Sequence, residues 1–397
     1  MYIGCVKRIN YSRTGMKESD NTFLFLPDIS GFSAFVNQTE VNHSRHIISE
    51  LLELLLKTNV LELEVVEVEG DAIFFFKTKK IPSLEELFMQ TESMFLAFHN
   101  HLEEYEAHRI CKCGACKTAN KLTLKFIAHS GPVEPIKIGK FRKLHGNDVI
   151  VSHRLMKNDI PSHEYLLVTK RLMQEMEDTG FVPDKQFNPH EAASAYENTG
   201  EVEYTYFDFK FLHQKVQTYK AQYHEYVKSN TISLTEEIAN EPYSLFDIIS
   251  NLKYRKKWNH SIKELYNDSN NINQSGDTHS CVVNNMVLQI ETIPVKSKGA
   301  DIVYGERIAR QGILKNIQLF YTVKPVGDKS RLVFEVSFQF LYPFLAFMKP
   351  YLYRRLSKMS EKMVRDLKYY AEHEHKTQPF KVDISKMIEK FSASTEE

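Results

Sequence analysis

The sequence predicts an α+β protein with two structured parts, and three observations lead to this prediction. The chain of 397 residues is longer than one ordinary domain and suits two. From residue 23 to residue 169, short apolar runs alternate with longer amphipathic segments, which is typical of a sheet covered by helices. From residue 231 to residue 340, strand-like segments follow one another, and one long helical segment comes after them.

In the first part, hydrophobic period and turn residues indicate each element. Gly70 and Asp71 mark the turn of an expected hairpin over 61–77. A cap at Ser83, with Glu85 and Glu86 in the first turn, starts one of the helices. Helices are expected at 33–57, 83–108 and 148–156. Strands are expected at 23–26, 122–129, 165–169 and 201–211.

The second part is separated from the first by a polar, Tyr-rich segment, so we place the domain boundary within 212–228. A short helix is expected at 242–249, and a long one at 343–373, where apolar residues recur close to the helical period. The expected strands are 231–239, 277–283, 287–294, 301–310, 317–325 and 331–340. The expected domains are 20–211 and 228–375, followed by a tail, 376–397.

Composition narrows the classes of function. The 51 basic residues balance the 51 acidic ones, so nothing global indicates a nucleic acid partner or an anionic membrane surface. No apolar run reaches the ~18 residues that a spanning helix needs. The five cysteines are odd in number and no secretory segment is seen, which favours free thiols and a cytoplasmic location.

Two aspartates lie within apolar segments of the first part. Asp28 ends the run that begins at Phe23, and Asp71 precedes Ala72-Ile-Phe-Phe-Phe76. A carboxylate in an apolar environment is costly unless it is paired or binds a metal ion. The two carboxylates could meet across neighbouring strands and bind a hard cation such as Mg²⁺. Alternatively, both are turn residues that cap a helix and a hairpin.

Four segments in order resemble the class III nucleotidyl cyclases, the adenylate and guanylate cyclases. The resemblance covers residues 20–175 and implies a ferredoxin-like fold in the first domain. The matching segments are Asp28-Ile-Ser-Gly-Phe-Ser33, Glu67-Val-Glu-Gly-Asp71, His129-Ser-Gly-Pro-Val133 and Gly146-Asn-Asp-Val-Ile-Val-Ser-His-Arg154.

The resemblance implies roles for individual residues in forming a cyclic nucleotide from a nucleoside triphosphate. Mg²⁺ or Mn²⁺ would be held by Asp28, Asp71 and the carbonyl group of Ile29. Arg154 would stabilise charge on the transferred phosphoryl group, and Glu67 would bind the base. Because such sites draw on two domains, a homodimer is implied. The backbone N–H groups implied to bind phosphate are those of Gly31, Phe32 and Ser33.

Two positions depart from the family pattern. Ile150 stands where an asparagine orients the ribose, and Lys143 stands where a second residue binds the base. The sequence therefore leaves two hypotheses open: a Mg²⁺-dependent cyclase, or a cyclase-like module that binds a nucleotide for regulation without turnover. A structural or interaction protein without a small ligand is a third reading.

A cysteine cluster follows the second expected helix. Cys111, Cys113 and Cys116 could supply three thiolates to a structural Zn²⁺, with His108 as the fourth ligand. Cys5 is a rival for that fourth position. The alternative is a group of reduced, partly buried thiols.

The second domain resembles the helix-grip fold of START-like and polyketide-cyclase-type (SRPBCC) proteins. The resemblance is carried by 242–249, 258–264, 276–279 and 364–369 and by the order of strands before one long helix. It implies an apolar cavity for a hydrophobic small molecule or lipid. The expected cavity or core residues are Phe246, Trp258, Met286, Phe320, Phe338 and Phe340.

Overall fold

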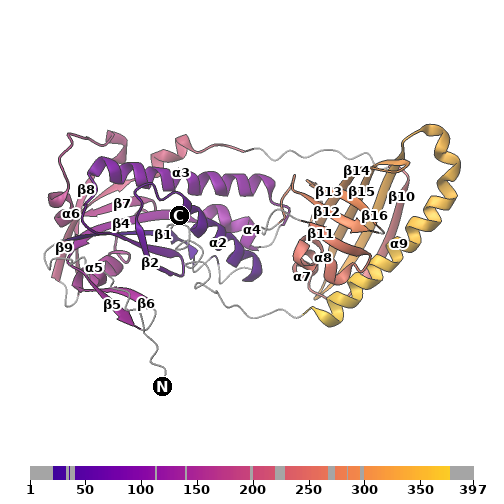
Figure 1. The fold of residues 1–397 in the computed structure, drawn as a ribbon, viewed down its shortest axis with the longest axis horizontal. Helices are drawn as coiled ribbons and strands as arrows, with labels where there is room; N and C mark the ends of the chain where they lie inside the picture. Colours follow the sequence, from indigo (N-terminus) through magenta and orange to yellow (C-terminus); the bar gives the residue numbers. More distant parts are fainter. Residues whose placement is uncertain are drawn as a thin grey trace, which may run out of the picture.

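A computed structural model gives the fold, and Figure 1 shows its ribbon. The structure describes residues 21–32, 35, 41–111, 114–138, 141–196, 200–219, 229–266, 273–283, 285–295 and 299–375. Within these ranges the strands form two seven-stranded sheets and one two-stranded hairpin. No helix in the described ranges is long and apolar enough to cross a membrane.

The first sheet has the strand order β2-β3-β1-β4-β7-β9-β8. Its strands are β1 (Thr22–Ser30), β2 (Glu64–Glu69), β3 (Ala72–Lys77), β4 (Thr123–Gly131), β7 (Tyr165–Thr169), β8 (His190–Tyr196) and β9 (Gly200–Asp208). The separate hairpin is formed by β5 (Glu134–Ile138) and β6 (Phe141–His145). The helices are α2 (Val41–Lys57), α3 (Leu84–His108), α4 (Gly114–Thr118), α5 (Asn147–Leu155) and α6 (Lys170–Glu175). Short 3₁₀ turns are η1 (Ala119–Lys121), η2 (Lys185–Phe187) and η3 (Lys210–Lys215).

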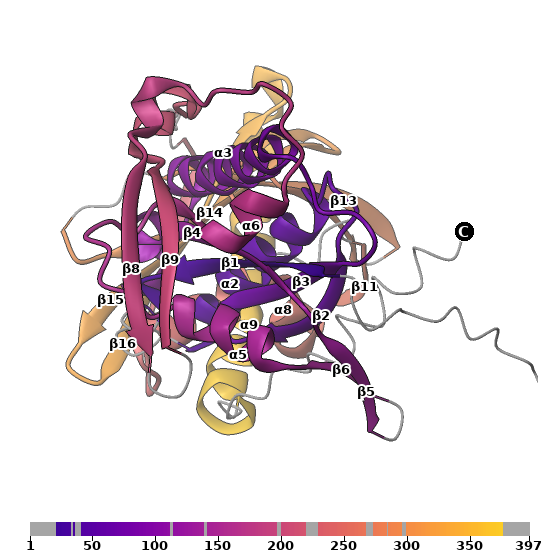
Figure 2. The same ribbon diagram turned by 90° about the vertical axis from the view of Figure 1, so that its left-hand side faces the viewer.

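The order β2-β3-β1-β4, with α2 after β1 and α3 after β3, is the ferredoxin-like arrangement that the resemblance implied. β1 is antiparallel to both β3 and β4, and β4 is parallel to β7. Successive side chains of β1 point to opposite faces of the sheet. Phe23 and Phe25 pack in the core with α2 and α3, whereas Leu24 and Leu26 pack with α5. Figure 2 shows α3 and α5 on opposite faces.

Local signals located most elements of the first part but missed some. The helix expected at 83–108 is α3, where Ser83 and Glu86 form a reciprocal capping box. The expected hairpin is formed by β2 and β3. The polar segment before residue 196 was not expected to form a strand, yet β8 pairs with β9 there. β8 lies at the edge of the sheet with many exposed side chains, so it lacks a strong hydrophobic pattern.

The second sheet is antiparallel, with the order β10-β16-β15-β14-β13-β12-β11. Its strands are β10 (Thr231–Ile238), β11 (Ile262–Tyr266), β12 (Thr278–Val283), β13 (Met286–Ile293), β14 (Ile302–Gln311), β15 (Leu314–Val326) and β16 (Lys329–Phe340). The helices are α7 (Pro242–Ser250), α8 (Leu252–Trp258) and α9 (Lys349–Tyr369), with the turns η4 (Pro343–Met348) and η5 (Tyr370–Glu374). A curved antiparallel sheet with one long C-terminal helix against it is the helix-grip arrangement (Figure 1).

The side chains expected in the core or cavity of this sheet are mostly buried. Phe246, Trp258, Phe320 and Phe338 are each at most 2% exposed. The expectation for Met286 was wrong, because its side chain is 44% exposed at the start of β13. Phe340 is half-buried near the end of β16.

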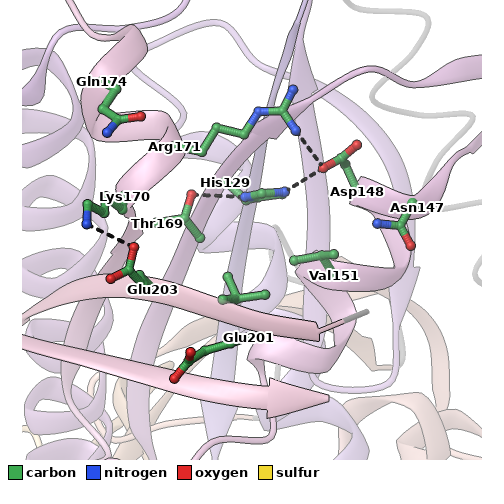
Figure 3. A pocket seen from close by; sticks show the side chains of 11 residues that line it. His129, Asn147, Asp148, Val151, Thr169, Lys170, Arg171, Gln174, Glu201 and Glu203 are labelled. Atoms are coloured by element: carbon green, nitrogen blue, oxygen red, sulfur yellow. Dashed lines mark hydrogen bonds and ion pairs between the residues drawn. The ribbon is translucent and has the colours of Figure 1, made fainter. Parts of the chain in front are cut away.

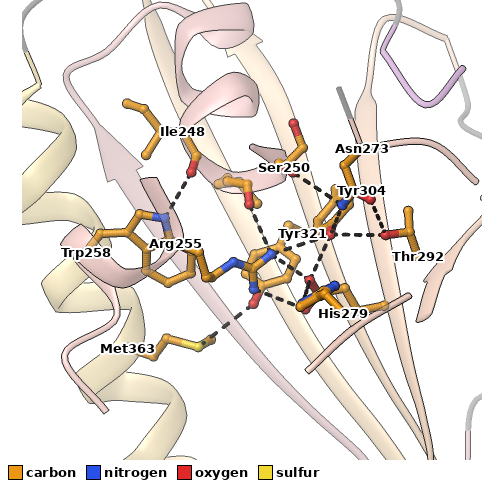
Figure 4. A network of polar contacts seen from close by, with 12 residues as sticks. Ile248, Ser250, Arg255, Trp258, Asn273, His279, Thr292, Tyr304, Tyr321 and Met363 are labelled. Atoms are coloured by element: carbon orange, nitrogen blue, oxygen red, sulfur yellow. Dashed lines mark hydrogen bonds and ion pairs between the residues drawn. The ribbon is translucent and has the colours of Figure 1, made fainter. Parts of the chain in front are cut away.

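A charged pair lies inside this second core, and Figure 4 shows its arginine, Arg255, within a network of polar contacts. Arg255 of α8 and Glu306 of β14 are 3% and 1% exposed, and their side chains form two hydrogen bonds, 2.5 and 3.1 Å long. The Tyr304 hydroxyl donates to Glu306 over 2.8 Å and accepts from Asn273 over 2.8 Å. Burial opposes ionisation of Glu306, but the Arg255 charge, a smaller contribution from His279 and the hydrogen bonds from Arg255 and Tyr304 together lower the pKa of Glu306. The core is therefore held by a charge pair as well as by apolar contacts.

Replacing Glu306 by glutamine should destabilise the second sheet, because the Arg255 charge would stay buried without a carboxylate. We expect the free energy of unfolding to fall by about 3–5 kcal/mol. Trp258 is the chain's only tryptophan, and the Arg255 guanidinium lies 5.1 Å from its ring centre. Its fluorescence during urea unfolding would measure the change.

The matched control is Glu291→Gln. Glu291 bonds Arg307 over 2.6 Å on the neighbouring strand, with 36% and 41% of the two side chains exposed. Its loss should cost less than about 1 kcal/mol, since exposed ion pairs contribute little. Equal effects of the two variants would contradict the assignment of Arg255 and Glu306 as a stabilising buried pair.

Candidate functional site

Strand register brings the two aspartates together at one end of the first sheet. Asp28 lies opposite Ala72 on β3 and opposite Lys125 on β4. Asp71 forms the turn immediately before Ala72, and its carbonyl oxygen accepts from the N–H group of Ile29 over 3.0 Å. The Ile29 side chain is fully buried, so only its backbone is available to the site. The structure therefore brings Asp28, Ile29 and Asp71 together, as the resemblance implied.

Sequence reasoning missed a third charged residue at this place, Lys125. Its ammonium lies 3.1 Å from Asp28 Oδ2 and donates to the carbonyl oxygen of Met156 over 2.8 Å. The side chains of Lys125 and Asp28 are each 14% exposed. A lysine in the apolar run Leu122–Ile127 was the available signal, because a buried ammonium needs a partner.

Asp71 carries the unbalanced negative charge of the site. Burial raises its pKa, the nearby Asp28 charge raises it further, and Lys125 offsets only part of the effect, so the pKa is about 6. Repulsion between two carboxylates that share one cationic partner is the condition that a divalent cation relieves. The oxygen donors of Asp28 and Asp71 therefore fit a hard cation.

The backbone after β1 has the geometry of a turn into a helix. Gly31 has φ +91°, a conformation that favours glycine. The Phe35 N–H group donates to the Gly31 carbonyl oxygen over 3.0 Å, so a helical turn begins directly after β1 at Phe32. Ser33 lies outside the described residues.

The two residues expected to bind a base are bonded to each other. Lys143 of β6 donates to Glu67 Oε2 of β2 over 2.9 Å, and this bond raises the pKa of Lys143. Lys143 is 58% exposed and Glu67 is 23% exposed. A ligand that binds Glu67 must therefore share its carboxylate with Lys143 or displace Lys143.

Helix α5 presents the other two family positions. Its buried residues Val151 and Leu155 anchor it against the sheet, on the face that carries Leu24 and Leu26. Ile150 is 48% exposed, so an apolar side chain faces solvent where the family has an asparagine. Arg154 is half-buried; burial raises the pKa of Tyr196 on β8, and the nearby Arg154 charge reduces that rise slightly.

A second group of polar side chains lines a pocket of about 490 Å³. Two of them, His129 and Asp148, were named from the sequence only as parts of the family segments. His129 bonds Thr169 Oγ1 over 2.9 Å and Asp148 Oδ1 over 3.0 Å, and Arg171 donates to the same Asp148 oxygen over 3.2 Å (Figure 3). Gly131 is required beside them, because a Cβ there would lie 2.1 Å from Asp148 Cγ. This chain of bonds fixes the start of α5 relative to β4 and β7.

The cysteine cluster is only partly described. Cys111 and Cys116 are buried, and Cys116 Sγ lies 3.0 Å from the Tyr105 hydroxyl. His108 Nδ1 bonds the carbonyl oxygen of Glu104 in its own helix over 3.0 Å. Cys113 and Cys5 lie outside the described residues. The zinc knuckle of Cys111, Cys113, Cys116 and His108 stays a prediction.

Comparisons with known proteins add little about activity. Residues 48–165 match a family model described as "Protein of unknown function (DUF2652)". The "Uncharacterized protein Rv2561/Rv2562" of Mycobacterium tuberculosis is 31% identical over 117 residues, which are 30% of this chain and 55% of that protein. The chain thus spans about half the length of this curated relative.

Solved structures with both kinds of fold are similar to parts of the chain. The guanylate cyclase domain of RhGC from Catenaria anguillulae, in complex with GTP, is 14% identical, covers 48% of this chain and 97% of that one, and has a TM-score of 0.36. A START superfamily protein from Mycobacterium smegmatis is 16% identical, covers 36% and 96%, and has a TM-score of 0.30. At such scores these likenesses carry no weight, and the fold assignment rests on strand order and register.

Proposed function

We propose that the first sheet binds a nucleoside triphosphate with Mg²⁺ or Mn²⁺, and that a homodimer of the chain converts it to a cyclic nucleotide. The observation that carries this proposal is the meeting of Asp28 and Asp71 through the pairing of β1 with β3. Two partly buried carboxylates that share one lysine partner, Lys125, favour a further cation.

The chain's own groups have distinct tasks in this proposal. Asp28, Asp71 and the Ile29 carbonyl would hold the metal ion, which neutralises phosphate charge and makes a ribose hydroxyl more acidic. The N–H groups of Gly31, Phe32 and Ser33 would bind phosphate oxygens at the start of the helical turn. Arg154 would act on the phosphoryl group bound by the partner subunit.

Binding without turnover is the second candidate, and particular contacts favour it. Lys125 already neutralises Asp28, and Lys143 already occupies Glu67. Exposed Ile150 offers no hydrogen bond to a sugar. A site of this kind would sense a nucleotide and pass the signal to the second sheet.

For the second sheet we propose a hydrophobic small molecule or lipid as ligand. Phe344 and Phe347 of η4 are 72% and 76% exposed where the chain passes from β16 to α9. Exposed aromatic side chains at one turn often mark a contact for an apolar partner.

Native mass spectrometry should show an apolar molecule bound to the wild-type protein, with a lower occupancy in the double variant Phe344→Ser/Phe347→Ser. Equal occupancy in both proteins would contradict this proposal.

The cyclase proposal predicts product from one of the four nucleoside triphosphates in the presence of Mg²⁺ or Mn²⁺. Asp71→Asn should lower the rate by at least about 100-fold, since it removes one of two carboxylate donors. Chromatography would measure the cyclic product. The control, Asp301→Asn, changes a half-buried partner of Lys324 beside the second sheet and should leave the rate unchanged.

Calorimetry with the same triphosphates separates the two candidates. Binding that is lost in Asp71→Asn, without product, would replace the cyclase by the binding module. Absence of both binding and product would refute both.

The raised pKa of Asp71 predicts a specific pH dependence. Because the folded pKa of about 6 exceeds the unfolded value of 3.8, the folded protein binds this proton more tightly. The contribution of Asp71 to stability therefore falls as pH rises from about 4 to about 6. At pH 7.5, Asp71→Asn should raise the free energy of unfolding of the metal-free protein by about 1 kcal/mol, after allowance for solvent screening.

The wild-type protein should show the complementary effect with metal. Mg²⁺ should raise its melting temperature at pH 7.5 and lose this effect below pH 6, where Asp71 is protonated. Calorimetric melting curves would measure both trends. A Mg²⁺ effect that persists at pH 5, or that persists in Asp71→Asn, would contradict the assignment.

A further inference from the structure

A second group of metal-binding side chains lies away from Asp28 and Asp71. His99 belongs to α3, Glu164 directly precedes β7, and His213 belongs to η3. One ligand atom from each lies within 4.8 Å of the others. Residues far apart in the sequence thus converge at the start of β7. Thr169, which lines the pocket described above, lies at the other end of this strand.

The separations between each histidine and Glu164 are close to those of a metal site. His99 Nε2 lies 3.2 Å from Glu164 Oε1, and His213 Nε2 lies 3.0 Å from each Glu164 oxygen. In a tetrahedral zinc site with bonds of about 2.0–2.1 Å, neighbouring ligand atoms are about 3.3 Å apart. A small inward or outward adjustment of the side chains would therefore accommodate an ion.

Burial and bonding distinguish this group from an ordinary ion pair. The side chains of His99 and Glu164 are each 8% exposed, and the ring of His99 packs 4.3 Å from that of Phe95 and 5.1 Å from that of Phe98. Although His99 Nε2 lies 3.2 Å from Glu164 Oε1, it forms no hydrogen bond of good geometry with any residue that the structure describes. A buried ring nitrogen without a partner costs free energy, which a metal ion would recover.

Two other groups of acidic side chains and histidines are less suited to a cation, although His101 Nε2 also lacks a hydrogen bond partner among the described residues. Glu67, Glu69 and His153 also lie within 4.8 Å of one another, but the Lys143 ammonium bonds Glu67 there and repels a cation. Glu50 contacts His46 through one oxygen, at 3.1 Å, and His101 through the other, at 3.5 Å, so these three do not converge.

We propose that His99, Glu164 and His213 bind a zinc ion. Two imidazole nitrogens and one carboxylate are a ligand set that zinc accepts, and three protein ligands leave a fourth position open. His213 is 45% exposed, so water or a small ligand reaches the fourth position from its side. The ion would join η3 to α3 and to the start of β7.

The test uses the full-length protein, stripped of metal with a chelator and then titrated with Zn²⁺. The wild type should bind zinc at this site and gain thermal stability. Loss of a group that only hydrogen-bonds a metal ligand costs roughly 10- to 100-fold in metal affinity. Because His213 is proposed as a ligand itself, His213→Ala should weaken zinc binding by more than that. The matched control is His101→Gln, a histidine of the same helix as His99, which should bind zinc as the wild type does.

Cobalt separates this site from the cysteine cluster. Co²⁺ in the proposed site should give visible bands of a four-coordinate ion without the near-ultraviolet thiolate band that cysteine ligands produce. Loss of those visible bands in His213→Ala, and also in Glu164→Gln if His213→Ala misfolds, would support the proposal. Unchanged spectra and zinc stoichiometry in a folded variant, or no zinc bound by the wild type, would overturn it.

Discussion

The pairing of β1 with β3 on one side and β4 on the other is the constraint on which the first sheet depends. Because side chains alternate between faces, this register sends Phe23 and Phe25 to α2 and α3 and sends Leu24 and Leu26 to α5. The same register puts Asp28 opposite Lys125 and beside the turn that holds Asp71. A slip of one residue would bury Asp28 among the apolar residues of α2 and α3, where no cation compensates it.

At three places in the molecule, buried charged side chains require a partner of opposite charge. In the second core, Arg255 and Glu306 satisfy each other through two hydrogen bonds. At Asp28 the compensation is incomplete, since Lys125 serves two carboxylates and the pKa of Asp71 stays raised. At Glu164 two imidazoles approach one carboxylate, and within the described part of the chain His99 Nε2 forms no hydrogen bond of good geometry. The first arrangement is that of a structural pair, and the other two are those for which we propose a bound cation.

The candidate site combines features that favour turnover with features that favour binding alone. The acidic end of β1 suits a metal ion and phosphates, whereas Lys143 bonds the residue expected to bind a base. These features lie on different elements, β1 with β3 on one side and the β5–β6 hairpin on the other. Movement of that hairpin relative to β2 would free Glu67 without disturbing Asp28 and Asp71.

The sequence by itself determined the α+β class, most helices and strands and the β2–β3 hairpin, and it indicated Asp28 and Asp71 as a candidate site. Hydrophobic period, caps and turn residues act over a few neighbours, so they can be seen in the chain alone. Only the tertiary structure decided that Lys125 pairs with Asp28, that Lys143 pairs with Glu67, and that His99, Glu164 and His213 meet. These contacts join residues brought together by strand order and helix packing, and no local pattern specifies such a pairing.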